Sequence, residues 1–185
     1  MSGYVTPRNK AARHSMLSSE RPMHPAHLPI DELLADCVVR NTRGSGPGGQ
    51  HRNKTDTAVV VSHTASRFVG QASERRSQGQ NRTAAIERLR LNLAVHVRSE
   101  GPRNEEVWRR WVRDGRVSIA ATHGDYPSLL ADAIDCLASH GYELAAASEE
   151  LGIASAQILK LLRGYTPALE YCNARRGELK LHSWR

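Results

Sequence analysis

The spacing of apolar residues changes several times along this 185-residue chain. Residues 1–30 show no apolar period and are rich in Ser, Arg, His and Pro, which predicts a disordered or loosely attached arm. Apolar, largely β-branched residues at 37–40 and 58–61, followed by a third run at 67–72, predict short strands. Only a few residues separate the last two strands, so we expect them to pair as a hairpin.

Helical spacing begins near residue 81. One stripe of apolar side chains predicts a long amphipathic helix over 81–98, and the stripe consists of Ile86, Leu89, Leu93 and Val97. We expect this helix to pack across the sheet. A shorter helix is expected over 105–112, where Trp108 and Trp111 have the spacing of core anchors.

The last third of the chain has the pattern of a small helical module. A proline near the start and a glycine at the end predict a helix over 125–141. Two shorter helices are expected over 143–151 and 155–162. From Pro167 onward, the sequence predicts only a last helical turn and a polar tail.

These elements together predict an α+β fold in which a long helix packs on a small mixed sheet, followed by a small all-α module. The expected organisation is an arm over 1–30, a main domain over 31–121 and a helical module over 122–185. We place the boundary between about 121 and 125, where the apolar pattern changes.

Residues 143–163 resemble a helix-turn-helix, with Leu151, Gly152 and Ile153 at the turn. The helix expected to read DNA in such a motif would carry several basic or amide side chains outward. Here the helix over 155–162 offers only Gln157 and Lys160. We therefore favour a docking or stabilising bundle over DNA binding.

Composition indicates a globular protein, with 39% apolar and 24% charged residues. No apolar run approaches the roughly eighteen residues that cross a bilayer. The first residues lack the apolar segment of a secretory signal, and the three cysteines form no CxxC pair. We expect a cytoplasmic protein with reduced thiols, no membrane partner and no metal or other cofactor.

Charge is concentrated in the middle of the chain. Residues 40–116 hold sixteen basic and seven acidic side chains, a net charge of +9, whereas residues 117–185 have a net charge of −2. Arginine predominates among the basic residues, which favours bidentate phosphate contacts and stacking on bases. The pattern predicts a polyanion partner for the middle of the chain, although a solvated basic face is the simpler alternative.

A loop is predicted over residues 44–50, because five of them are Gly or Pro. A phosphate-binding P-loop requires glycine directly before its Lys-Ser/Thr pair, whereas Asn53 precedes Lys54-Thr55 here, so that match fails. A plain surface loop and a loop that presents Gln50 beside two glycines remain as alternatives.

Two linked motifs decide between these alternatives. The first comprises Ser45, Gly46, Gly48-Gly49-Gln50-His51, Asn53-Lys54-Thr55 and Ala58; the second comprises Glu74, Arg76-Ser77-Gln78, Asn81 and Ala85. With these motifs at this separation, residues 43–98 resemble the catalytic domain of class I peptide-chain release factors and their ribosome-rescue relatives. The resemblance covers about a third of the chain.

The resemblance implies hydrolysis of the ester that joins the nascent peptide to tRNA, in the peptidyl-transferase centre of the large ribosomal subunit. Glycines 48 and 49 have no Cβ, so the backbone can approach RNA closely. Gln50 would then offer its backbone N–H to the developing oxyanion, a donor worth on the order of 3 kcal/mol. The implied partners are the ribosome, its RNA, peptidyl-tRNA and a glutamine methyltransferase that modifies Gln50.

The resemblance also assigns roles to individual residues. The expected catalytic residues are Gly48, Gly49 and Gln50. The residues expected to support the loop are Ser45, Gly46, His51, Asn53 and Thr55. The residues expected to contact RNA are Arg43, Arg52, Lys54, Arg75, Arg76, Gln78, Asn81 and Arg82.

Only about forty residues precede the loop, too few for a domain that reads stop codons. We therefore expect the codon-independent branch, which rescues stalled ribosomes, although residues 173–185 are less basic than the tails usual in that branch. The first alternative is a ribosome- or RNA-binding protein that retains the fold without turnover. The second is a helix-turn-helix DNA-binding regulator.

Overall fold

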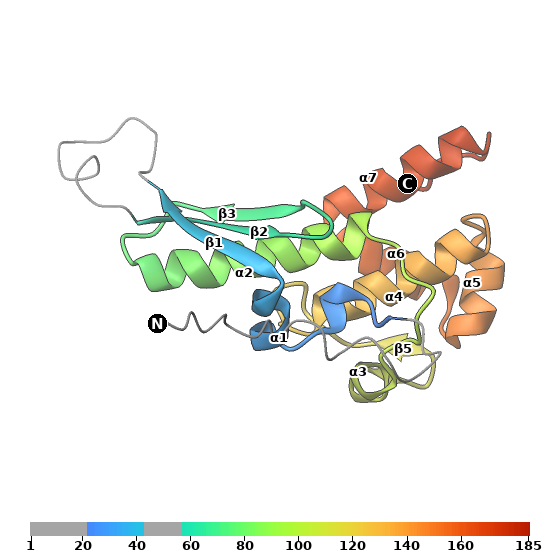
Figure 1. Cartoon of the computed structure of the whole chain (residues 1–185). Helices are drawn as coiled ribbons and strands as arrows, with labels where there is room; N and C mark the ends of the chain where they lie inside the picture. Colours follow the sequence, from blue (N-terminus) through green and yellow to red (C-terminus); the bar gives the residue numbers. More distant parts are fainter. Residues whose placement is uncertain (1–21, 43–56) are drawn as a thin grey trace, which may run out of the picture.

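The computed structural model describes residues 22–42 and 57–185. The fold is α+β, as the sequence predicts. A three-stranded sheet lies on a long helix, and further helices are gathered beneath and beyond the far end of that helix (Figure 1). Among the helices of this part of the chain, none is both long and apolar enough to cross a membrane.

The sheet is formed by β1 (Cys37–Thr42), β2 (Ala58–His63) and β3 (Val69–Ala72) in the order β1-β2-β3. Both strand pairs are antiparallel, so the expectation of a mixed sheet is wrong for the described strands. The short turn after β2 forces β3 to run back beside it, because parallel neighbours need a long crossover. The expected hairpin is confirmed.

Helix α2 (Gln78–His96) covers one face of the sheet. The predicted stripe is confirmed, since Ile86, Leu89 and Leu93 are buried and Val97 packs partly buried beside them. They form one apolar cluster with Val59 and Val61 from β2 and with Leu33 from α1 (Ile30–Ala35). The helix is therefore fixed against the strands that flank the predicted loop.

The remaining helices and strands are all shorter than α2, although α7 is longer than the sequence predicts. They are α3 (Glu105–Trp111), β4 (Val112–Arg113), β5 (Arg116–Val117), α4 (Tyr126–Ser139), α5 (Leu144–Leu151), α6 (Ser155–Gly164) and α7 (Thr166–Glu178). Helix α7 replaces the single turn expected after Pro167. It is stabilised because Ala168 and Cys172, four residues apart, are both fully buried.

A second apolar cluster connects the helices to the rest of the chain. It contains Ala94 and Val95 from α2 and Trp108 from α3, together with most of the buried side chains of α4 and α6. Trp108 thus has the predicted role of core anchor. Residues on both sides of the expected boundary near 121–125 share this core, and a separate domain over 31–121 stays a prediction.

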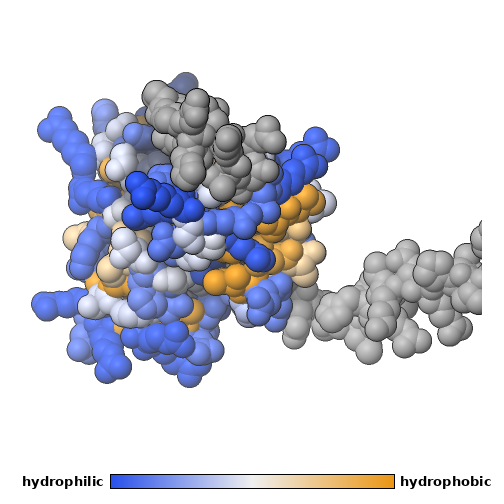
Figure 2. Space-filling view, turned by 90° about the vertical axis from the view of Figure 1, so that its left-hand side faces the viewer, coloured by the Kyte–Doolittle hydropathy of each residue, from blue (hydrophilic) through white to orange (hydrophobic). Residues whose placement is uncertain are grey.

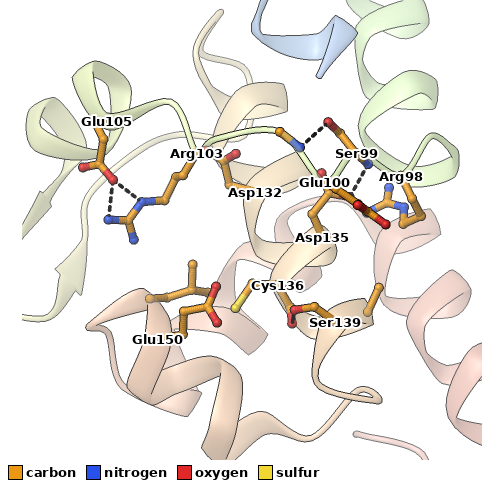
Figure 3. Close-up of a pocket in the computed structure, with 13 residues that line it drawn as sticks. Arg98, Ser99, Glu100, Arg103, Glu105, Asp132, Asp135, Cys136, Ser139 and Glu150 are labelled. Carbon is orange, nitrogen blue, oxygen red and sulfur yellow. Dashed lines mark hydrogen bonds and ion pairs between the residues drawn. The ribbon is translucent and has the colours of Figure 1, made fainter. Parts of the chain in front are cut away.

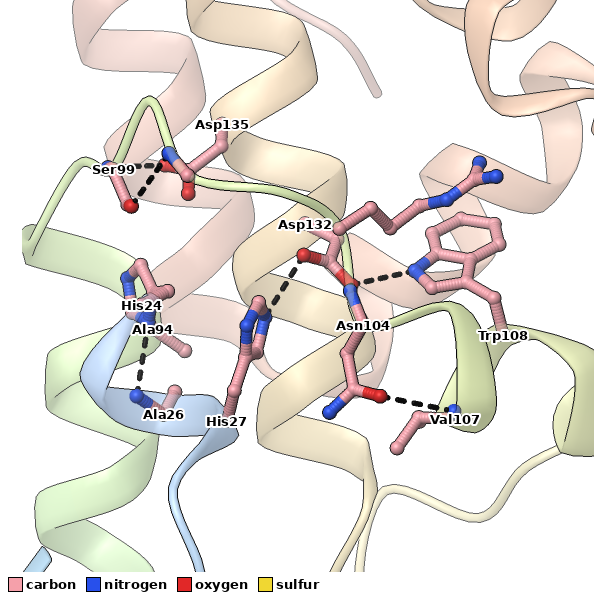
Figure 4. A network of polar contacts seen from close by, with 12 residues as sticks. His24, Ala26, His27, Ala94, Ser99, Asn104, Val107, Trp108, Asp132 and Asp135 are labelled. Carbon is pink, nitrogen blue, oxygen red and sulfur yellow. Dashed lines mark hydrogen bonds and ion pairs between the residues drawn. The ribbon is translucent and has the colours of Figure 1, made fainter. Parts of the chain in front are cut away.

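Residues 22–30 differ from the loose arm that the sequence predicts, and residues 1–21 of that arm lie outside the described part. His24, Ala26 and His27 are buried, and Pro25–His27 forms the short helix η2. His24 Nε2 lies 3.1 Å from the Val97 carbonyl oxygen. His27 Nε2 lies 2.8 Å from Asp132 Oδ1 (Figure 4). Polar contacts with distant residues hold this segment, so it needs no apolar period.

Candidate active site

The predicted catalytic loop leaves the sheet at one end. Strand β1 ends at Thr42 and β2 begins at Ala58, and these two residues are antiparallel partners. The strands carry this end away from the C-terminal helices, and the first turn of α2 lies beside it (Figure 1). The sheet thus fixes both ends of the connecting segment at a projecting tip.

Most of the predicted site residues belong to the connecting segment 43–56, which lies outside the described residues. These are the proposed catalytic set Gly48, Gly49 and Gln50, the loop-supporting set Ser45, Gly46, His51, Asn53 and Thr55, and the basic residues Arg43, Arg52 and Lys54. Their roles stay predictions, and the described residues define the support on which they depend.

Asn81 is the central residue of that support. Its amide Nδ2 donates to the Thr57 carbonyl at 2.6 Å and to the Arg75 carbonyl at 2.9 Å, while its Oδ1 accepts from the Arg75 backbone N–H at 2.9 Å. Asn81 therefore joins the first turn of α2 to Thr57, which directly precedes β2, and to Arg75 in the turn that follows β3. Such an amide matches three backbone groups that would otherwise be left without partners.

This geometry corrects the expectation that Asn81 contacts RNA. The side chain is fully buried and its donors and acceptor are used within the protein. The other described candidates, Arg75, Arg76, Gln78 and Arg82, are exposed. Figure 2 views the molecule from this end, where hydrophilic side chains cover much of the visible surface beside an apolar patch.

The second sequence motif stabilises the turn before α2. Ser77 caps the helix by accepting from the Gln80 backbone N–H at 3.4 Å. Glu74 accepts from Arg88 at 2.6 Å, and Arg88 also donates to the Gln71 carbonyl at 2.6 Å. Hydrogen bonds from the backbone N–H groups of Ser73 and Glu74, and then from Arg88, lower the pKa of Glu74 to about 2. The Glu74 carboxylate is thus held ionised beside β3.

Part of the positive charge in the middle of the chain is engaged inside the protein. Arg90 donates to the Gly124 and Ala26 carbonyls at 2.6 and 2.8 Å, and Arg98 pairs with Asp135 at 2.7 Å. The net charge of residues 40–116 therefore overstates the charge offered to a partner. We regard the exposed Arg75, Arg76 and Arg82, near the loop base, as the RNA contacts to test among the described residues.

The helix-turn-helix pattern does not present the side chains that the sequence suggested. On α6, Gln157 Oε1 accepts from the Val117 backbone N–H at 3.1 Å, and Lys160 Nζ donates to the Val117 carbonyl at 3.2 Å. Both residues are therefore used to attach the β4–β5 hairpin to α6. This contact favours the stabilising bundle over the DNA-reading helix.

Comparisons with known proteins agree with this architecture. Residues 29–122 match the family model described as RF-1 domain. The chain is 38% identical over 84 residues to peptide chain release factor 1 of Acidovorax sp. (strain JS42) and, equally, of Acidovorax ebreus (strain TPSY). It is 40% identical over 76 residues to peptide chain release factor 1 of Delftia acidovorans (strain DSM 14801 / SPH-1).

The family match covers half of the chain, and the α+β fold is consistent with it. The chain belongs to the class I peptide-chain release factor family. The aligned segments cover 45%, 45% and 41% of this chain but only 23%, 23% and 21% of the respective relatives. The chain thus spans under a quarter of the length of the relatives that it matches.

Proposed function

We propose that this protein hydrolyses the ester of ribosome-bound peptidyl-tRNA through the loop that contains Gly48, Gly49 and Gln50. The observation that carries the proposal is the release-factor domain over residues 29–122, in which Thr42 and Ala58, the strand residues that flank the predicted catalytic loop, are paired. The chemistry calls for a narrow tip, because the scissile ester lies inside a crowded RNA centre.

The proposed chemistry needs little from the protein beyond position. Gly48 and Gly49 allow close backbone approach, and the Gln50 N–H stabilises the negative charge that develops as water attacks the ester carbonyl. The neutral Gln50 side chain lines the site of the water molecule. Positioning and one preorganised donor act together, while the ribosome and tRNA supply the remaining groups.

The hydrogen bonds of Asn81, which we call the Asn81 clamp, support this proposal because they hold one end of the loop in place. The loop can present an amide accurately only if its ends are fixed, and the ladder pair Thr42–Ala58 and the Asn81–Thr57 hydrogen bond fix them. In the proposal, Arg75, Arg76, Gln78 and Arg82 then contact phosphates of tRNA or ribosomal RNA. A glutamine methyltransferase that acts on Gln50 is a further proposed partner.

We propose further that release does not depend on a stop codon and serves ribosome rescue in the cytoplasm. Residues 22–28, directly before the matched domain, fold back onto α2 and α4 instead of extending from the domain. That arrangement supports a compact catalytic unit, and codon independence is the part of the proposal that the release assay tests.

The direct test is release of labelled peptide from ribosomes that carry peptidyl-tRNA, with the decoding site empty, filled by a sense codon or filled by each stop codon. We expect release with the decoding site empty and no acceleration by a stop codon. Gln50→Pro, which removes the backbone N–H, should slow release by a hundredfold or more. Gln50→Ala, which keeps that N–H, should be slowed less, and Gln71→Ala, at an exposed glutamine on β3, should not be slowed.

The outcomes distinguish the alternatives. Release only with a stop codon would contradict rescue and leave codon-dependent termination. Binding to ribosomes without any release by the wild type would contradict hydrolysis and support a binding protein that lacks turnover. Equal release by Gln50→Pro and Gln71→Ala would remove the loop's proposed role.

A further inference from the structure

A group of three potential metal ligands lies far from the predicted catalytic loop, where α4 ends against α5. Cys136 and His140 are four residues apart, so they lie on the same face at the end of α4, and Glu150 faces them from α5. One ligand atom from each residue lies within 4.8 Å of the other two. Figure 3 shows Cys136 and Glu150 pointing toward each other.

The distances can be compared with those of a tetrahedral site. His140 Nε2 lies 3.3 Å from Glu150 Oε2, and the three ligand atoms lie within 4.8 Å of one another. Ligands bound to Zn²⁺ at about 2.0 to 2.3 Å are separated by about 3.3 to 3.7 Å. In the proposed site, side-chain rotation shortens the separations that exceed this range.

His140 is oriented by its own helix. Its Nδ1 lies 2.9 Å from the Cys136 carbonyl oxygen and 3.1 Å from Ser139 Oγ. When Nδ1 carries the proton, it donates to the helix carbonyl and leaves the Nε2 lone pair on the side of Glu150. Metal-binding histidines commonly have this second hydrogen bond, which fixes the tautomer and the ring.

An ion can reach this group from solvent. Cys136 and Glu150 line an open pocket of about 930 Å³, together with Arg98, Arg103 and Asp135 (Figure 3). Cys136 is 6% exposed, and the side chains of His140 and Glu150 are 28% and 59% exposed. The thiol is thus enclosed while the remaining coordination positions stay accessible to water.

We propose that Cys136, His140 and Glu150 form a binding site for one divalent ion of the zinc class, with water completing its coordination. A thiolate, an imidazole and a carboxylate are a donor set that Zn²⁺ accepts in proteins. The ion would link α4 to α5 and so stabilise the helical half of the molecule. The site is independent of the peptide-release proposal, since none of its residues lies near the loop base.

Titration of the full-length, metal-free protein with Co²⁺ tests the proposal, because a cobalt–thiolate bond gives a near-ultraviolet charge-transfer band that histidine-only sites lack. We expect this band with one Co²⁺ per chain, its loss on addition of Zn²⁺, and its absence in Cys136→Ser. Cys37→Ser, at a cysteine outside the group, should retain it. Absence of the band in wild type, or its persistence in Cys136→Ser, would overturn the proposal.

A second variant keeps the test valid if Cys136→Ser does not fold. Glu150→Gln changes a largely exposed side chain, so the fold should survive, and Zn²⁺ affinity should fall at least tenfold. Zn²⁺ should also raise the melting temperature of the wild type and of His182→Ala, but not that of His140→Ala. Unchanged affinity in Glu150→Gln, or an equal rise in melting temperature in both histidine variants, would contradict the site.

Discussion

At the scale of single residues, Asn81 shows how a buried amide can hold the base of a predicted catalytic loop. It is fully buried, and it connects α2 to Thr57 at the end of the loop segment and to Arg75 in the turn after β3. A side chain in this position acts on the loop without touching a substrate. Its contribution is therefore expected in both stability and release rate.

We predict that Asn81→Ala lowers the free energy of unfolding by about 1 to 3 kcal/mol, because the Arg75 N–H and two carbonyls lose their partner. The release rate should fall as well, since Thr57 is no longer held. Urea unfolding and the peptide-release assay measure the two effects. Gln80→Ala, an exposed change on the same helix, is the control, and equal behaviour of the two variants would refute the clamp.

The sequence motif pointed to Asn81 but not to its role. A motif shows which residue types accompany each other, whereas burial depends on how β2, β3 and α2 meet. Asn81 was therefore predicted to contact RNA alongside Arg75 and Arg82, which are exposed. The clue available in the sequence was its position four residues after the helix-capping Ser77, on the side of the helix that continues into Ala85 and Leu89.

At the scale of elements, the close contact of β3 with α2 sets the layer spacing of the domain. A Cβ at Gly70 would lie 1.9 Å from the Ala85 carbonyl oxygen and 2.5 Å from the Leu89 backbone nitrogen. Both neighbours are helix backbone, which cannot rotate away as a side chain can. Only glycine lets the strand approach the helix this closely.

We predict that Gly70→Ala destabilises the protein by about 3 kcal/mol or more, because strand and helix must separate and open the core around Leu89. Gly124→Ala is the matched control, since a Cβ there meets no atom within 4 Å. Thermal unfolding of the two variants gives the comparison. Similar melting temperatures would show that the layers separate easily.

Elements were predictable where an apolar period was strong. The stripe of Ile86, Leu89, Leu93 and Val97 predicts α2 because it repeats at helical spacing over about three turns. Helix α7 was missed because Ala168 and Cys172 are its fully buried apolar residues, and the segment after them is polar. There Arg176 supplies the contacts, donating to the Tyr142 and His182 carbonyls, which no periodicity indicates.

At the scale of the whole molecule, residues 22–29 fasten the domain to α4. His27 contacts Asp132, which also accepts from Trp108 Nε1 at 2.6 Å. Nearby, His24 is almost fully buried, and burial lowers the pKa of His24 to about 3. The sequence could not predict this network, because each contact is a single polar pair between residues far apart in the chain, such as His24 and Val97, which are 73 positions apart.

This network predicts a specific response to acid. His24 is neutral in the folded state, whereas the unfolded state takes up a proton below pH 6.5, so His24 reduces stability as pH falls toward about 3. The loss should approach about 1.4 kcal/mol per pH unit within that window. His24→Gln should remove it, and the measurement is urea unfolding of both proteins across the range.

Wild type must be compared with His24→Gln because Asp135 changes stability with pH in the opposite direction to His24. Burial raises the pKa of Asp135 to about 6, so its folded form binds a proton more readily and gains stability as pH falls through that value. The difference between wild type and His24→Gln cancels this contribution. A difference that stays constant from pH 6.5 to 4 would show that His24 is not buried as a neutral ring.

The central claim is that glycine 49 lets the Gln50 amide reach the ester of peptidyl-tRNA. The most direct measurement is the single-turnover rate of peptide release by Gly49→Ala and by Gly124→Ala, on the same ribosomes and at saturating protein. The account predicts that Gly49→Ala is slowed a hundredfold or more, while Gly124→Ala retains the wild-type rate. Equal rates for the two variants would contradict it.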